Sequence, residues 1–137
     1  TGVDISWGML SQAKSRAARY QGGFRLTQSD VEHLAFGDET FDTVVTSCTF
    51  CSVPDPVAGL RELRRVLKPG GELRMFEHTG SRWFPFRLML NAMTPITRRF
   101  GPEMNRDTVS NVVKSGFKLR SVQNVYLDVV KIIVAGK

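Results

Sequence analysis

The sequence has 137 residues, of which 42% are hydrophobic and 23% charged, and this balance excludes a disordered chain and suits one packed domain. Nineteen Lys and Arg against thirteen Asp and Glu give a formal net charge of +6, which suits an anionic partner or simply a basic solvated face. No apolar run approaches the ~18 residues of a spanning helix and no signal-type segment opens the chain, so we expect a cytoplasmic protein.

Strand-like and helix-like patterns alternate as far as residue 78. The β-branched run Phe41–Ser47 is typical of a buried parallel strand. In chain order we predict a strand end at 1–5, a helix capped by Ser6 and ended by Gln21-Gly22-Gly23, a strand at 24–27, a strand at 41–47, a helix opened by Pro54-Asp55-Pro56, and a strand at 72–77. This order predicts an α/β fold: a Rossmann-like, doubly wound, mostly parallel sheet.

The pattern changes after His78, within what we take as a single domain over 1–137. Residues 82–105 form a hydrophobic insert flanked by arginines, with a helix expected over 86–93 and closed by Pro95. The insert suits a substrate lid or a peripheral contact with an anionic bilayer, and equally a helix covering the sheet. Next we predict a helix from Asp107 to Lys114 with Val109, Val112 and Val113 inward, then an antiparallel hairpin of strands at 117–126 and 129–135.

Two aspartates follow predicted strands. Asp4 could accept hydrogen bonds from both hydroxyls of a ribose, and Asp30 could accept one from an adenine amino group. The alternatives are a helix cap for Asp4 and a solvated loop residue for Asp30. The two positions support each other, because ligands of such sheets gather at the carboxyl ends of the strands.

Other chemistry-bearing residues give weaker signals. Cys48-Thr49-Phe50-Cys51 is a single C-x-x-C, and only two histidines are available to complete a zinc site, so we expect no metal. Glu77-His78 at a strand end could supply a base near a substrate or serve the structure. Lys and Arg are scattered and no motif for a flipped base is visible, so we expect no nucleic-acid partner.

Several stretches resemble class I S-adenosylmethionine-dependent methyltransferases. They are Gly2-Val3-Asp4-Ile5-Ser6-Trp7-Gly8-Met9-Leu10, then Ser29-Asp30-Val31-Glu32-His33-Leu34-Ala35-Phe36, and Val53-Pro54-Asp55-Pro56 followed by Leu60-Arg61-Glu62-Leu63-Arg64-Arg65-Val66-Leu67-Lys68-Pro69-Gly70-Gly71. The subgroup is the one that contains ubiquinone and menaquinone biosynthesis methyltransferases and phospholipid N-methyltransferases. Cys51-Ser52-Val53 and Phe76-Glu77-His78 also resemble membrane-associated thiol methyltransferases. The resemblance covers residues 2–78, and the remainder agrees in pattern only.

The resemblance implies S-adenosylmethionine as cofactor and a small or lipophilic methyl acceptor. It does not identify a catalytic residue, and the missing catalytic signature does not count against the assignment, because the cofactor carries the hard chemistry. By position it implies that Asp4 binds the ribose hydroxyls, Ile5 and Met9 pack on the adenine, Asp30 accepts from the adenine amine, the Val31 amide donates to the ring, and Ser47 lies near the methionyl end.

One departure from the family concerns its glycine-rich loop. No G-x-G-x-G occurs in the chain, and we expect that loop to precede Thr1 together with the first strand and helix. Without that middle strand two strand edges would lie open, which favours self-association or a borrowed strand, and we expect the chain alone to be inactive. A non-catalytic methyltransferase-like interaction module is the alternative function.

Overall fold

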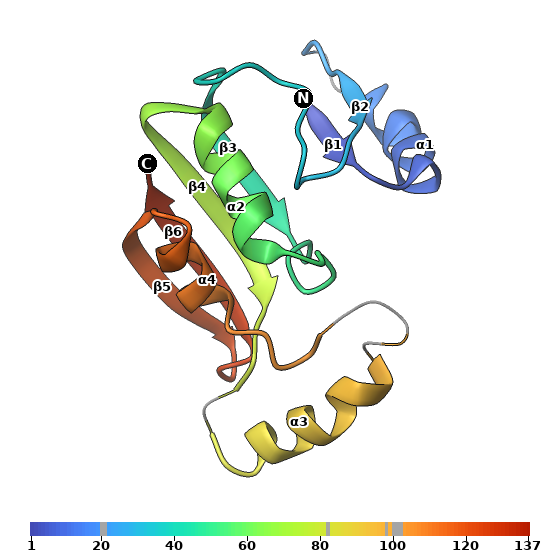
Figure 1. Ribbon diagram of the computed structural model, residues 1–137. Helices are drawn as coiled ribbons and strands as arrows, with labels where there is room; N and C mark the ends of the chain where they lie inside the picture. Colours follow the sequence, from blue (N-terminus) through green and yellow to red (C-terminus); the bar gives the residue numbers. More distant parts are fainter. Residues whose placement is uncertain (20–21, 82, 98, 100–102) are drawn as a thin grey trace.

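The computed structural model describes residues 1–19, 22–81, 83–97, 99 and 103–137 (Figure 1). Within these residues, no helix is long and apolar enough to cross a membrane. The elements are β1 (Gly2–Asp4), α1 (Trp7–Ala17), β2 (Leu26–Gln28), β3 (Phe41–Ser47), α2 (Pro56–Val66), β4 (Leu67–His78), α3 (Phe86–Thr97), α4 (Thr108–Lys114), β5 (Lys118–Tyr126) and β6 (Val130–Gly136). Their order confirms the alternating α/β pattern and the final hairpin.

The strands form two separate sheets. β1 and β2 pair in parallel, and the second sheet has the order β3-β4-β6-β5. β3 and β4 are parallel, whereas β6 is antiparallel to both β4 and β5. Figure 1 shows the β1–α1–β2 unit beside the free edge of β3, so the strand order is interrupted between β1 and β3.

The core lies between the larger sheet and the helices α2 and α4. Asp55 caps α2 by accepting from the amides of Val57 and Ala58, and Pro56 occupies the first turn, where its missing N–H costs nothing. Leu60 and Leu63 of α2 are buried. The core consists of Phe50, Val53, Leu60, Leu63, Leu67, Leu73, Met75, Val112, Phe117, Ile133 and Ala135.

Several predicted boundaries differ from the structure. β2 spans Leu26–Gln28 rather than 24–27. β4 begins at Leu67 instead of residue 72, because Leu67 already pairs with Phe41 before the register shifts. Gly70 accommodates the irregularity with a φ of 76°, a backbone conformation that favours glycine. α1 ends at Ala17, and the predicted stop at Gln21 falls outside the described residues.

The helix α3 departs from the prediction in length and surroundings. It continues to Thr97 with Pro95 inside it, because a proline in the last turn removes only one ladder bond, while the Thr94 hydroxyl donates to the Leu90 carbonyl at 2.7 Å. Only Leu90 of this helix is buried. Figure 1 shows α3 beyond the end of the sheet, away from α2 and α4. In α4, Val112 is buried as expected but Val113 is exposed, so its inward placement was wrong.

Candidate functional site

A cavity of about 790 Å³ lies between β1 and β3. Its lining reaches from Thr1 and Phe41, at the starts of the two strands, to Asp4 and Ser47 at their ends. All six residues predicted for a cofactor site line it: Asp4, Ile5, Met9, Asp30, Val31 and Ser47. The structure therefore brings together residues that the sequence places in three separate segments.

The two aspartates combine a local structural contact with exposure to the cavity. The Oδ1 atom of Asp4 accepts from the Ser6 amide at 2.8 Å, and Oδ1 of Asp30 accepts from the Glu32 amide at 2.9 Å. The residue that caps α1 is Ser6, whose hydroxyl accepts from the Met9 amide. Within the described part of the chain neither carboxylate makes a further hydrogen bond, so each keeps acceptor capacity for a ligand.

Apolar side chains from the start of α1, the loop after β2, β3 and α2 line much of the cavity. Ile5 is 65% exposed and Met9 is 55% exposed, although both side chains are apolar. Val31 is half-buried and packs against the core from the opposite loop. Apolar walls with a few converging polar groups are typical of small-molecule sites.

The Glu77 side chain of β4 holds the loop that follows β3 through hydrogen bonds. This fully buried carboxylate accepts from the Thr46 hydroxyl at 2.9 Å, the Thr49 amide at 3.2 Å and the Phe50 amide at 3.1 Å. Burial raises the pKa of Glu77, against the opposing effect of these hydrogen bonds. Glu77 does not line the cavity, so its contacts favour the structural alternative over a base near a substrate.

Arg106 also holds the loop after β3. Its guanidinium donates to the carbonyls of Phe50 and Val53 and pairs with Glu103 at 2.7 Å. Sequence reasoning missed this residue, because the two carbonyls that it holds lie more than fifty positions away and no motif surrounds it. Thr46 was also missed, although its position beside the predicted Ser47 was the available signal.

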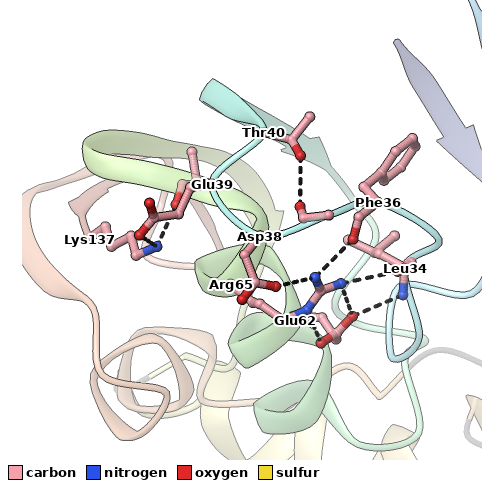
Figure 2. Close-up of polar contacts among 10 residues, drawn as sticks. Leu34, Phe36, Asp38, Glu39, Thr40, Glu62, Arg65 and Lys137 are labelled. Carbon is pink, nitrogen blue, oxygen red and sulfur yellow. Dashed lines mark hydrogen bonds and ion pairs between the residues drawn. The ribbon is translucent and has the colours of Figure 1, made fainter.

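The loop that carries Asp30 and Val31 is attached to α2 (Figure 2). Arg65 donates to the carbonyls of Leu34 and Phe36 and to the carboxylates of Glu62 and Asp38. The Leu34 amide donates in turn to Glu62, and Arg65 holds the pKa of Glu62 below its usual range. This network fixes one wall of the cavity to the rigid core.

The remaining chemistry-bearing residues do not gather into a further site. Cys48 is exposed and lines the cavity, whereas Cys51 is buried, and both are free thiols. In the described ranges no cluster of three or more His, Cys, Asp or Glu could hold a metal ion. The Nδ1 atom of His78 is buried and finds no hydrogen-bond partner among the residues that the structure describes, and burial lowers the pKa of this side chain.

Comparison with known proteins gives relatives by sequence and by fold. The family described as "Methyltransferase domain" matches residues 1–75. A demethylmenaquinone methyltransferase of Streptomyces griseus is 38% identical over 100 residues, 69% of this chain and 42% of that protein. The one from Bacillus subtilis is 37% identical over 63% of this chain and 37% of its own length. The chain thus spans about two fifths of the length of these curated relatives.

Solved structures agree on the fold. A SAM-dependent methyltransferase from Methanosarcina mazei superposes with a TM-score of 0.75 at 23% identity, covering 99% of this chain and 80% of that one. The cyclase SpnF superposes with a TM-score of 0.76 at 18% identity, covering 99% of this chain and 64% of its own. These similarities show the Rossmann-like methyltransferase fold. Because the family match spans more than half of the sequence, the chain belongs to the methyltransferase domain family.

Proposed function

We propose that this domain serves the transfer of a methyl group from S-adenosylmethionine to a small or lipophilic acceptor. The observation that carries the proposal is one cavity with carboxylates at the ends of two adjacent parallel strands and apolar side chains beside them. Carboxylates with free acceptor capacity suit the ribose hydroxyls and the adenine amine, and the apolar walls suit a flat ring.

Within this proposal the chain's residues bind and orient rather than react. Asp4 would hold the ribose, Ile5 and Met9 the adenine ring, Asp30 and the Val31 amide its polar edge, and Ser47 the methionyl end. When bound, S-adenosylmethionine supplies an electrophilic methyl group on a sulfonium, so alignment of the acceptor accounts for much of the catalysis. The loop contacts of Glu77, Arg65 and Arg106 would keep these binding residues in place.

The names of the relatives support one of the two candidate functions. The relatives by sequence carry the names of quinone-pathway methyltransferases, which favours methyl transfer to a lipophilic acceptor over a non-catalytic interaction module. The fold alone does not choose the reaction, because SpnF shares it and is named as a cyclase. We further propose that the 137-residue chain by itself does not turn over, since its sequence contains no G-x-G-x-G loop to approach the methionyl group.

A titration tests the cofactor assignment. Asp4→Ala should weaken S-adenosylmethionine binding by about 1.5–3 kcal/mol, the range for hydrogen bonds to a charged group. NMR chemical-shift titration suits the weak affinity expected of this chain. Asp42→Ala is the matched control, because Asp42 is an exposed aspartate that pairs with Lys68 and does not line the cavity. Equal affinities of the Asp4→Ala variant and the unaltered chain would refute the assignment.

We also propose that the α3 region contacts a lipid surface or a lipophilic acceptor. Trp83 and Phe84 are 70% and 82% exposed just before the helix, and Leu88, Met89 and Ile96 are exposed along it. Arg87 and Arg99 lie in the same segment and are exposed, which adds attraction to anionic headgroups. Exposed aromatic residues beside arginines are typical of helices that lie in a membrane interface.

Liposome co-sedimentation tests the membrane part. The double variant Trp83→Ser, Phe84→Ser should bind vesicles containing phosphatidylglycerol several-fold more weakly than the unaltered chain, because it loses the most exposed apolar surface. Phe24→Ser is the control, since Phe24 is an exposed aromatic residue far from α3 in the chain. If the unaltered chain does not sediment with these vesicles at low salt, the membrane contact is wrong.

A further inference from the structure

A second pocket, with a volume of about 260 Å³, lies along the carboxyl-terminal half of α2. None of its lining residues lines the larger cavity that holds the predicted cofactor residues. The lining comes from the segment before β3, from α2, from the end of α4 and from the residue after β6, so only folding brings it together. We call it the basic pocket, after its four basic side chains: Arg61, Arg64, Arg65 and Lys137.

The lining of the basic pocket has an excess of positive charge, because only two acidic side chains, Asp38 and Glu39, face the four basic ones. Nη1 of Arg65 lies 2.7 Å from Oδ1 of Asp38, and Glu62, outside the lining, also pairs with Arg65 (Figure 2). Nζ of Lys137 lies 3.5 Å from Oε1 of Glu39. Both acidic side chains are therefore engaged, and no described carboxylate pairs with the remaining two cations.

These two cations are Arg61 and Arg64. Arg61 is exposed, and in the described ranges it has no hydrogen-bond or ionic partner. Arg64 is half-buried and its Nε donates to the Gly116 carbonyl at 3.1 Å, while its terminal nitrogens bond to no described residue. A carbonyl fixes a guanidinium without neutralising it, so Arg64 is pre-positioned for an anion. Arg61 lies within one turn of Arg64 and Arg65, and a bound anion would relieve their mutual repulsion.

Interaction with the helix dipole explains only part of this arrangement. Cations are favoured in the last turn of a helix, which accounts for Arg64 and Arg65 of α2. It does not account for Lys137, which reaches the pocket from beyond β6 and whose side chain is only 16% exposed. The Lys137 ammonium donates to the Leu67 carbonyl at 2.6 Å, so a neutral group again holds a cation in place. Fixed cations from two separate elements are typical of a site that concentrates anions.

We propose that the basic pocket binds the phosphate group of a soluble phosphate monoester. Such a group carries about two negative charges at neutral pH, which match the two cations without a counter-charge. The guanidinium fork also fits the oxygens of a phosphate geometrically. A volume of about 260 Å³ is small for a whole ligand, so the pocket would take the phosphate group and leave the rest of the molecule outside.

The position of the basic pocket favours a soluble ligand over a lipid headgroup. In the ladder of β4 and β6, Glu72 pairs with Gly136 at the end next to Lys137. His78 pairs with Val130 at the other end, from which the chain leads to α3. The pocket and the exposed α3 segment therefore lie toward opposite ends of the larger sheet, as the positions of the C-terminus and α3 in Figure 1 show. A membrane that contacts α3 would not reach the pocket.

An NMR titration of the 137-residue chain with methyl phosphate, at constant ionic strength, tests the site. We expect shifts that saturate and that are largest at the amides of Asp38, Ser115 and Gly116, which lie in or next to the lining. Dimethyl phosphate carries one negative charge fewer and should bind at least about fivefold more weakly. Shifts spread over other basic surfaces, or equal affinities for the two compounds, overturn the proposal.

Three variants that each remove one arginine separate a site from general attraction. Arg64→Gln should weaken methyl phosphate binding at least about tenfold, and Arg61→Gln at least about threefold. Arg61 contacts no described residue through its side chain, so its effect cannot come from a disturbed fold. Arg25→Gln is the matched control, because Arg25 is exposed and does not line the pocket, and its affinity should stay within about twofold. Equal losses in Arg61→Gln and Arg25→Gln overturn the proposal.

Two further measurements separate this proposal from a lipid ligand and from the proposed methyl transfer. The Arg64→Gln and Arg25→Gln variants should sediment equally with vesicles that contain phosphatidic acid, whose headgroup is a phosphate monoester. Weaker sedimentation of Arg64→Gln alone would make a lipid headgroup the ligand and overturn the soluble one. Asp4→Ala should leave methyl phosphate affinity unchanged, because Asp4 lines only the larger cavity, and a loss there would overturn the independence of the two sites.

Discussion

Replacing Glu77 by Ala should loosen the loop after β3 and destabilise the whole domain. The side chain is fully buried and accepts three hydrogen bonds, from the Thr46 hydroxyl and the amides of Thr49 and Phe50. Without it, the Phe50 amide and the Thr46 hydroxyl remain buried with no acceptor. Each buried group without a partner costs about 1–3 kcal/mol. Removing the buried carboxylate also removes its desolvation penalty, which offsets part of that cost, so we expect the free energy of unfolding to fall by about 2–4 kcal/mol.

The Glu77→Gln variant should lose less free energy of unfolding, about 1–2 kcal/mol. Its amide oxygen still accepts a hydrogen bond, but its NH2 group replaces the second carboxylate oxygen and faces one of the donors that bonded to it. Urea unfolding followed by tryptophan fluorescence measures both variants. Glu72→Gln is the control on the same strand, where Glu72 pairs with the exposed Arg74 and a loss below about 1 kcal/mol is expected. If the Glu77 variants lose no more free energy of unfolding than the Glu72→Gln control, the stabilising role of the Glu77 hydrogen bonds is refuted.

The pH dependence adds a signed test of the same residue. Burial raises the folded-state pKa of Glu77 above its ordinary value, so the folded state holds this proton more tightly than the unfolded state. The resulting stability is fully present below the unfolded-state pKa and is lost as pH rises through the folded-state pKa. The Gln side chain of the Glu77→Gln variant cannot titrate. The difference in free energy of unfolding between the unaltered chain and this variant should therefore become smaller as pH rises. A difference in free energy of unfolding that grows with pH would contradict the raised pKa of Glu77.

Three further predictions concern groups around the site. Arg106→Ala should cost about 2 kcal/mol in urea unfolding, because it breaks a half-buried ion pair with Glu103 and leaves the Phe50 carbonyl without its donor. Arg65→Ala should cost about 2 kcal/mol, with exposed Arg61→Ala of the same helix nearly neutral, and equal losses would contradict the role of the network in Figure 2. Burial lowers the pKa of His78, so stability should fall as pH drops below about 6.5, and His78→Phe should remove that slope.

Local sequence was sufficient for the elements that local chemistry specifies. The bounds of β3 were predicted from a β-branched run, and the start of α2 from Asp55 and Pro56, because capping and strand propensity act over a few residues. The predicted site residues also line one cavity, since Asp4, Asp30 and Ser47 all lie at or just beyond the carboxyl end of a parallel strand.

Only the tertiary structure decided which residues hold that site in place. The partners of Glu77 lie 27 to 31 positions away, and the carbonyls that Arg106 contacts lie 53 and 56 positions away, so no local pattern indicates these contacts. Pairing of Leu67 with Phe41 sets the start of β4, five residues before the predicted start at residue 72. The exposure of α3 was likewise undetermined, because an apolar helix looks the same in sequence whether it covers a sheet or faces outward. These features depend on which segments pack together, and packing is fixed only when the whole chain has folded.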